Sequence, residues 1–107
     1  MRFLMLVCVD DELAGTVDAN PAAWVAETTA KRQRIEGNQL RPVSDATTLW
    51  PKDGGGTFVS DGPFAETKEQ IAGYDILECV DLAEAVEVAA KHPAAGIGAI
   101  ELRPVWE

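Results

Sequence analysis

Three segments carry apolar patterns that predict strands. Residues 3–9 are continuously apolar and end at the acidic run of residues 10–12, and seven residues suit a buried strand better than a helix. Because the run is unbroken, we expect a central strand covered on both faces. Residues 71–80 predict a longer strand. Residues 96–105 predict a final strand, with Glu101 and Arg103 on one face.

Two further segments have helix start and stop signals. Asn20 as N-cap, with proline at the next position, begins a helix predicted to cover residues 21–35 and to end at Gly37-Asn38. Large apolar residues are few in it, which indicates a lightly packed face beside a cavity or a second subunit. Residues 81–84 form a capping-box-like start for a second helix, which ends at His92-Pro93.

The middle of the chain predicts a hairpin. Residues 39–50 are typical of an extended segment whose first half is irregular, because Pro42 cannot donate to a central sheet ladder. Residues 51–56 contain Asp-Gly and Gly-Gly steps and predict a turn, and residues 57–60 predict the short return strand.

The resulting order, β-α-β-β-β-α-β, predicts an α+β fold: a ferredoxin-like βαββαβ sandwich with an extra short hairpin strand. In this topology both helices cover one face of the sheet. An apolar central strand leaves the other face in need of a cover, and a second copy of the chain is the simplest candidate. We therefore expect a homodimer through the sheet faces.

Size and charge limit the function. With 107 residues, 47% of them hydrophobic, the chain is expected to form one domain over residues 1–107. A formal net charge of −9 repels phosphate backbones and anionic lipid, so we expect neither direct nucleic-acid binding nor membrane binding. The first apolar run is too short to span a membrane and has no signal-peptide cleavage site, so a cytoplasmic location is expected.

The inventory of reactive side chains is small. Cys8 and Cys79 each lie in an apolar run, which favours buried free thiols. One histidine and no Cys-x-x-Cys pair make a nitrogen and sulfur metal site implausible, and the glycine run of residues 54–56 lacks the context of a phosphate loop. We expect no metal and no cofactor.

Residues 61–69, Asp-Gly-Pro-Phe-Ala-Glu-Thr-Lys-Glu, form the most informative segment, and Gly73-Tyr74 follows it. Together they resemble the signature of the DGPF branch of the YCII-related proteins. The apolar first strand, the start of the second helix and residues 100–105 also fall where that family has them, so the resemblance covers nearly the whole chain.

The resemblance implies a dimeric α+β barrel in which two ferredoxin-like sheets face each other. It also implies varied roles: some relatives look like small enzymes that use a His-Asp pair, one of them a dehydrochlorinase, and some are linked to extracytoplasmic-function sigma factors. The histidine of that pair lies in the first helix of those relatives. The corresponding segment here, residues 21–36, has no histidine, so the pair does not carry over.

The Asp61 segment has two interpretations. In the architectural one, Gly62 and Pro63 shape a tight turn, Asp61 accepts backbone hydrogen bonds as an Asx-turn, and Phe64 anchors the loop in the core. In the functional one, Asp61, Glu66 and Lys68 lie at a pocket mouth, where a buried carboxylate acts as a general base and the lysine holds an anionic substrate.

Four other residues are candidates with plain structural alternatives. Arg103 forms an ion pair with Glu101 or Asp61, or its guanidinium binds a substrate carboxylate in a bidentate manner. Tyr74 is packing or a proton donor. Trp24 is core, interface or cavity wall. His92 caps the second helix, where the helix dipole favours its protonated form.

Two functions remain open. One is a domain that binds a small polar or anionic molecule between the first helix and the sheet, with or without catalysis. The other is a non-catalytic regulatory or partner-binding module, linked to an extracytoplasmic-function sigma factor as in some relatives. The absent helix histidine favours the second, and the cluster of Asp61, Glu66, Lys68 and Arg103 favours the first.

Overall fold

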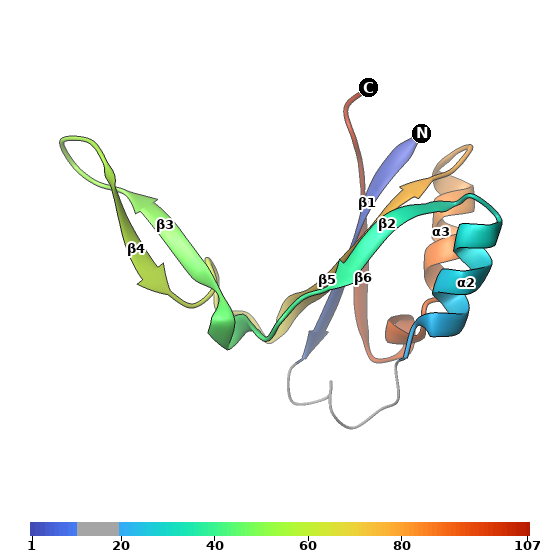
Figure 1. Ribbon diagram of the computed structural model, residues 1–107, viewed down its shortest axis with the longest axis horizontal. Helices are drawn as coiled ribbons and strands as arrows, with labels where there is room; N and C mark the ends of the chain where they lie inside the picture. The colour runs from blue at the N-terminus through green and yellow to red at the C-terminus, as the bar shows by residue number, and fades with distance from the viewer. Residues whose placement is uncertain (11–19) are drawn as a thin grey trace.

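A computed structural model describes residues 1–10 and 20–107, which fold into a four-stranded sheet, two helices and a projecting hairpin (Figure 1). In chain order the elements are β1 (Arg2–Asp10), α2 (Ala22–Ala30), β2 (Arg34–Gln39), the 3-10 turn η1 (Val43–Asp45), β3 (Thr47–Pro51), β4 (Thr57–Asp61), β5 (Glu69–Glu78), α3 (Leu82–Ala90), the 3-10 turn η2 (Pro93–Gly96) and β6 (Gly98–Pro104). The main sheet has the order β2-β5-β1-β6, and all neighbours are antiparallel. The predicted ferredoxin-like α+β fold is confirmed.

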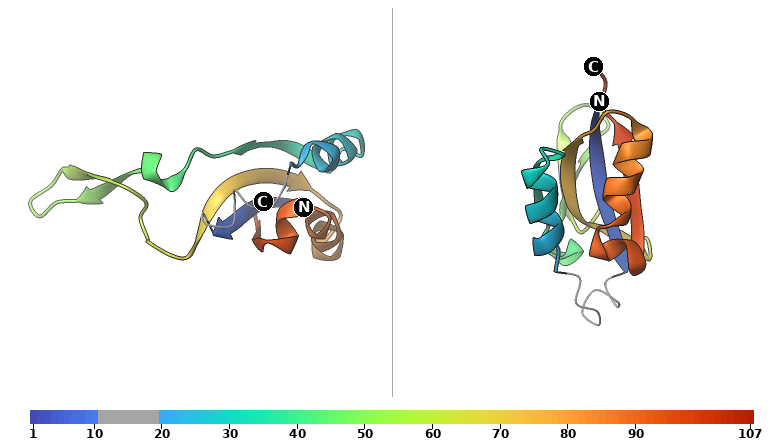
Figure 2. Two further views of the ribbon diagram at one scale, coloured as in Figure 1. Left: turned by 90° about the horizontal axis from the view of Figure 1, so that it is seen from below. Right: turned by 90° about the vertical axis from the view of Figure 1, so that its right-hand side faces the viewer.

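The central strand, β1, explains where the core lies. Its alternate residues Phe3, Met5, Val7 and Val9 are buried under the helices, and Phe3 and Met5 are fully inaccessible. The residues between them, such as Leu4 and Leu6, are only half-buried on the opposite face. The predicted central position is therefore correct, but the helices cover one face only. We call the other the open face, and in Figure 2 both helices lie away from it.

The first helix is shorter than its sequence predicts. It ends at Ala30, and Arg32 takes a left-handed conformation with φ of 58° that reverses the chain. Arg34 then begins β2, which pairs with β5, so Gly37 and Asn38 lie in a strand and do not end the helix. Arg34, which falls inside the predicted helix, has a side chain that is only 16% exposed. Pairing with the edge of β5 outweighs the helical propensity of this segment, as tertiary context often does.

The second helix begins where predicted. The Asp81 carboxylate accepts a hydrogen bond from the Glu84 N–H at 2.9 Å, and the Glu84 carboxylate accepts from the Val80 N–H at 3.2 Å. The helix ends before His92, as expected from Pro93. Among the described residues, no helix is both long and apolar enough to cross a membrane.

The predicted hairpin forms a separate two-stranded sheet, which we call the arm (residues 47–61). β3 pairs with β4 from Thr47–Asp61 to Pro51–Thr57, and three glycines with positive φ form the turn. The arm projects away from the main sheet on the side opposite to the helices (Figures 1 and 2). The first half of residues 39–50 is irregular, as expected from Pro42: β2 ends at Gln39, and η1 lies between the sheet and the arm.

Candidate functional site

A site with apolar and polar walls lies between α2 and the helix-facing side of the sheet. A cavity of about 600 Å³ opens there. Its wall combines apolar and polar residues, contributed by β1, α2, β2, β5, η2 and positions beside them: Val7, Val9, Asn20, Pro21, Trp24, Val25, Arg34, Gly37, Asn38, Gln39, Ala72, Gly73, Tyr74, Asp75, His92, Ala94 and Ile97. An apolar pocket with few convergent polar groups is typical of a small-molecule site.

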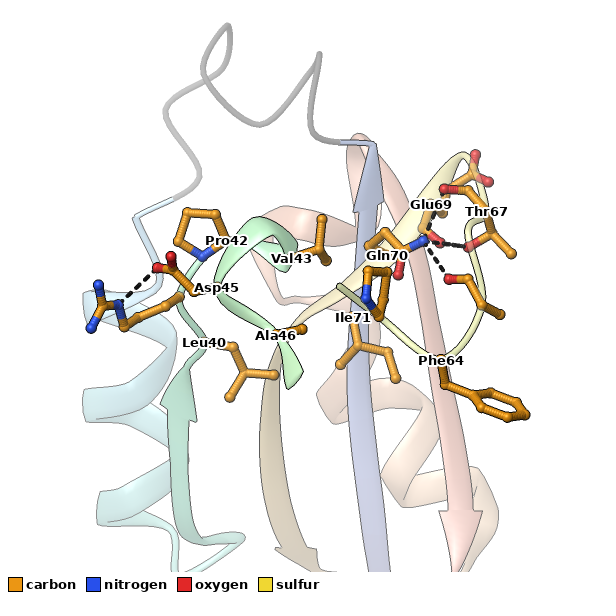
Figure 3. A pocket seen from close by; sticks show the side chains of 13 residues that line it. Leu40, Pro42, Val43, Asp45, Ala46, Phe64, Thr67, Glu69, Gln70 and Ile71 are labelled. Carbon is orange, nitrogen blue, oxygen red and sulfur yellow. Dashed lines mark hydrogen bonds and ion pairs between the residues drawn. The ribbon is translucent and has the colours of Figure 1, made fainter. Parts of the chain in front are cut away.

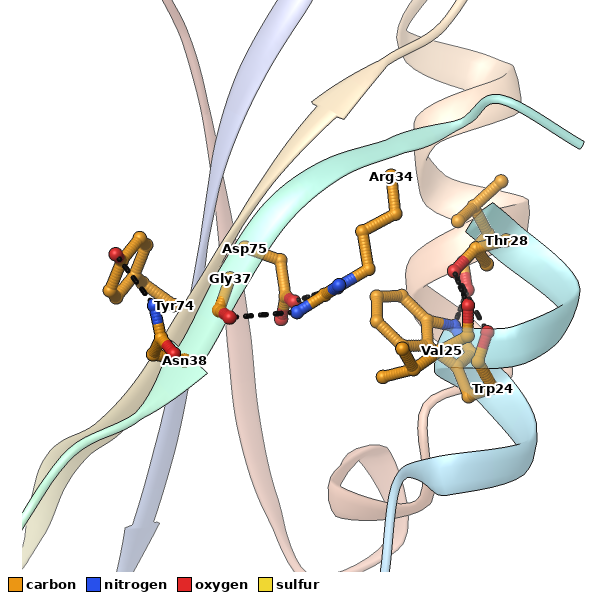
Figure 4. A network of polar contacts seen from close by, with 9 residues as sticks. Trp24, Val25, Thr28, Arg34, Gly37, Asn38, Tyr74 and Asp75 are labelled. Carbon is orange, nitrogen blue, oxygen red and sulfur yellow. Dashed lines mark hydrogen bonds and ion pairs between the residues drawn. The ribbon is translucent and has the colours of Figure 1, made fainter. Parts of the chain in front are cut away.

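A buried ion pair forms one side of the cavity (Figure 4). The Arg34 Nε donates to Asp75 Oδ1 at 2.7 Å, and its Nη2 donates to the Gly37 carbonyl at 2.8 Å. The two side chains are 16% and 9% exposed. Gly37 makes room for this pair, because a Cβ at its position would lie 2.1 Å from Asp75 Oδ1. The alternation of β5 places Asp75 on the helix side, in phase with Leu77.

The charge of Asp75 is not fully compensated. Burial raises the pKa of its carboxyl above the usual range, and the hydrogen bond and charge of Arg34 oppose this shift only in part. Within the described part of the chain, Arg34 is the hydrogen-bond partner found for this carboxylate, through Oδ1. The second oxygen, Oδ2, is left to accept a further hydrogen bond.

His92 lies at the other side of the cavity, directly after α3. It is 8% exposed, and its ring packs edge-on against Trp24 with centroids 4.8 Å apart. The Ala94 N–H donates to His92 Nδ1 at 3.0 Å. A nitrogen that accepts this bond carries no proton, so the neutral ring has its hydrogen on Nε2.

Burial and the hydrogen bond from the Ala94 N–H both favour the neutral form of His92. Burial lowers the pKa of its imidazole, and the nearby charge of Asp75 raises it by less. Protonation would also place a hydrogen on Nδ1 against the Ala94 N–H. The prediction that His92 caps the second helix in its protonated form is therefore wrong. In the described ranges no hydrogen bond of Nε2 is found, and His92 is one of the residues that line the cavity.

Trp24 is fixed as the wall that supports this histidine. Its Nε1 donates to the Val88 carbonyl of α3 at 2.9 Å, and the Thr28 hydroxyl donates to the Trp24 carbonyl at 2.8 Å (Figure 4). The first of these bonds joins α2 to α3 beside the cavity. A ligand in the cavity would meet a neutral donor, a carboxylate acceptor and apolar walls.

The sequence-predicted site residues do not converge on this cavity. Trp24 lines it. Tyr74 reaches its rim, but the Tyr74 hydroxyl accepts a hydrogen bond from Asn38 on the other side of the strands from Asp75 (Figure 4). Arg103 lies on β6 in an exposed ion pair with Glu101. Glu66 and Lys68 line a different hollow, near the base of the arm.

The loop after Asp61 is held by other contacts than expected. Among the described residues, no hydrogen bond to the Asp61 carboxylate is found, so the Asx-turn is not formed. Instead, the Gly62 N–H donates to the Ala46 carbonyl at 2.8 Å, with the glycine at φ of 100°. Gln70 donates to the carbonyls of Ala65 and Thr67, which fastens the other end of the loop (Figure 3).

Phe64 does not anchor this loop in the core. It is 76% exposed and stacks on Trp50 of the arm, with ring centroids 5.3 Å apart. It also borders a hollow of about 570 Å³ at the base of the arm, together with Leu40, Pro42 and Ile71 (Figure 3). The prediction of a core anchor failed because the arm, not the body, supplies the aromatic surface.

Sequence reasoning missed Arg34 and Asp75. Arg34 falls within the predicted first helix and Asp75 within a predicted apolar strand, and neither was a candidate site residue. A signal for Asp75 was present, because it shares the parity of Leu77 and therefore the buried face. Across residues 1–10 and 20–107, no three side chains of the metal-binding types come together.

Comparison with known proteins adds the family. The uncharacterised protein R00369 of Rhizobium meliloti (strain 1021) is 35% identical over 116 residues, which cover 94% of this chain and 89% of the relative. The family model of the YCII-related domain matches residues 1–107. The chain therefore belongs to the YCII-related domain family.

Proposed function

We propose that this domain binds a small molecule with a polar head and an apolar body in the cavity between α2 and the sheet. The observation that carries the proposal is that His92, whose Nδ1 is occupied by the Ala94 N–H, and the buried Asp75 carboxylate line one cavity. The ligand head accepts from His92 and donates to Asp75. A hydroxyl, enol or amide group satisfies both.

The charge of the cavity narrows the ligand class. Arg34 is the basic side chain among the described lining residues of the cavity, and Asp75 already neutralises it. A free carboxylate on the ligand would therefore meet the Asp75 charge without an unpaired cation. We infer that a neutral hydroxyl compound is preferred over an anion, which refines the sequence-based expectation of a polar or anionic ligand.

The same two groups suit proton transfer. A carboxylate whose pKa is raised by burial is a better base near neutral pH than an exposed one. It would take a proton from a carbon beside a carbonyl; the electron pair of that C–H bond would form the C=C bond of an enolate, and the π pair of the carbonyl would move to its oxygen. His92 Nε2–H would stabilise the resulting oxyanion as a neutral donor.

Two finer assignments belong to this proposal. Residues 61–69 support membership of the DGPF branch. The half-buried apolar residues of the open face, including Leu4, Leu6 and Ile76, support a homodimer in which two sheets face each other.

Binding of a matched pair of probes, phenol and benzoate, tests the ligand site. In ¹H–¹⁵N correlation spectra phenol should shift the Trp24 indole and the His92 and Ala94 amide signals, and benzoate should bind more weakly. Asp75→Asn should weaken phenol binding, whereas Glu66→Gln, in the separate hollow, should not. Phenol-induced shifts confined to residues 61–70 would contradict the proposal.

A further inference from the structure

The arm exposes apolar side chains on both of its faces. Leu49 and Val59 are directly paired across the hairpin and are each 62% exposed. On the other face Phe58 stacks on Trp50, with ring centroids 6.3 Å apart, and Phe64 stacks on Trp50 from the following loop. A two-stranded hairpin without further packing is marginally stable in water. The arm therefore needs a surface against which to pack.

The shape of the chain shows that its own body does not supply that surface. The radius of gyration is 15.8 Å, with extents of 49 × 38 × 18 Å. A compact chain of this length has a radius of gyration of about 13 Å. The arm accounts for the difference, since it stands clear of the sheet and helices in Figure 1 and in the left view of Figure 2.

The open face of the sheet is the second apolar surface without a cover among the described residues. Leu4 and Leu6 of β1 and Ile76 of β5 lie half-exposed at its centre. The arm projects from the body on the same side as the open face (Figure 2). A second copy seated on the open face would therefore lie beside the arm.

The dimensions agree with such an arrangement. Five residues of β-strand span about 17 Å, and two facing sheets pack about 10 Å apart. An arm of this length reaches past the gap and onto the body of the facing copy. Charge also permits the contact, because residues 47–61 carry one lysine and two aspartates, a net charge of −1, whereas the whole chain carries −9.

We infer that the arm of each copy packs on the sheet of a second copy. The dimer then contains two such contacts, which are related by its two-fold axis. Leu49 and Val59, which share one face of the arm, are the side chains that this contact buries. A two-fold pair satisfies the arm and the open face of both copies at once. This inference rests on the proposed sheet-face dimer and adds the element that closes it.

Light scattering of the full chain and two lysine variants tests the arm. Val59→Lys lies on the arm, and Val86→Lys on the outer face of α3 is its control, since Val86 is a similarly exposed valine at 51%. Wild type and Val86→Lys should be dimers. Val59→Lys should raise the dimer dissociation constant at least tenfold, with circular dichroism unchanged in its helical signal.

A third variant, Leu6→Lys, distinguishes the arm contact from the sheet-face contact of the dimer. Leu6→Lys places a charge on the open face and should also dissociate the dimer. If Leu6→Lys dissociates it and Val59→Lys does not, the sheet-face dimer stands and the arm contact is overturned. A wild-type chain that is monomeric at about 100 µM, far above the dissociation constant of a stable dimer, overturns both.

Discussion

The body and the arm place the same kinds of residue in opposite surroundings. In the body, Leu77 is fully buried and the Arg34–Asp75 pair is mostly buried. In and beside the arm, Leu49 and Phe64 are mostly exposed, and the nearby Arg41–Asp45 pair lies open. The difference teaches that the body folds on its own contacts, whereas the arm has local pairing without a core. Its apolar surface is available for a partner, and the polar groups of the body are available for a ligand.

Truncation of a matched leucine pair should give the largest difference. Leu77→Ala removes a fully buried side chain and should lower the free energy of unfolding by roughly 3 to 5 kcal/mol. Leu49→Ala removes a side chain that is 62% exposed and should cost less than about 0.5 kcal/mol in dilute solution. Urea denaturation followed by circular dichroism measures both. Equal costs would show that the arm is part of the folded core.

Breaking a matched ion pair should give the next largest effect. Arg34→Met leaves Asp75 buried without its partner and should destabilise the fold by about 3 kcal/mol. Arg41→Met breaks an ion pair whose arginine side chain is 86% exposed and should cost about 0 to 0.5 kcal/mol. Thermal and urea unfolding provide the measurement. The double variant Arg34→Met with Asp75→Leu should recover most of the loss, because no charge is then left buried.

A pair of glycines distinguishes lack of space from backbone strain. Gly37→Ala directs a Cβ onto Asp75 Oδ1 and should cost about 1 to 3 kcal/mol while disturbing the cavity. Gly55→Ala, at the arm tip, meets open space but keeps a φ of 103°, so the expected cost is about 1 kcal/mol with the cavity unchanged. Unfolding curves measure the costs, and the His92 and Ala94 amide signals report on the cavity. A disturbed His92 signal in the Gly55 variant would contradict this separation.

The sequence predicts secondary structure well where a residue pattern has a single interpretation. The apolar run of β1, the capping residues of α3 and the glycine turn of the arm each agree with the structure. The helix predicted through residues 31–35 failed because their charged pattern suits a helix and an edge strand alike, and pairing with β5 decides between them. Local propensity does not contain that information.

The site was less predictable than the fold for a related reason. Arg34, Asp75 and His92 are far apart in the sequence and meet only through the sheet register and the end of α3. The Asp61 loop stands out because its residues are contiguous, yet its polar side chains face other surroundings. A contiguous motif reports on local turn geometry, whereas a cavity is assembled from separate elements.

The smallest predicted effect concerns the protonation of His92, and it tests whether the cavity holds a neutral donor. In ¹H–¹³C spectra the pKa of this imidazole, the single one of the chain, should lie below the ordinary histidine value of 6.5. Its ¹⁵N shifts should show the hydrogen on Nε2. Asp75→Asn should lower the pKa further, because it removes the charge that raises it and leaves the Arg34 charge unopposed.

The lowered pKa of His92 makes the stability of the fold depend on pH. Because the folded pKa of His92 is depressed, its contribution to stability is full above pH 6.5 and is lost as pH falls through the folded value. Asp75 acts oppositely: its raised pKa contributes stability below its unfolded value that is lost as pH rises through the folded one. His92→Gln should therefore flatten the loss of stability on acidification that wild type shows below pH 6.5. A His92 pKa above 6.5 would mean that the Asp75 charge outweighs burial, and the cavity would then hold an imidazolium in place of a neutral donor.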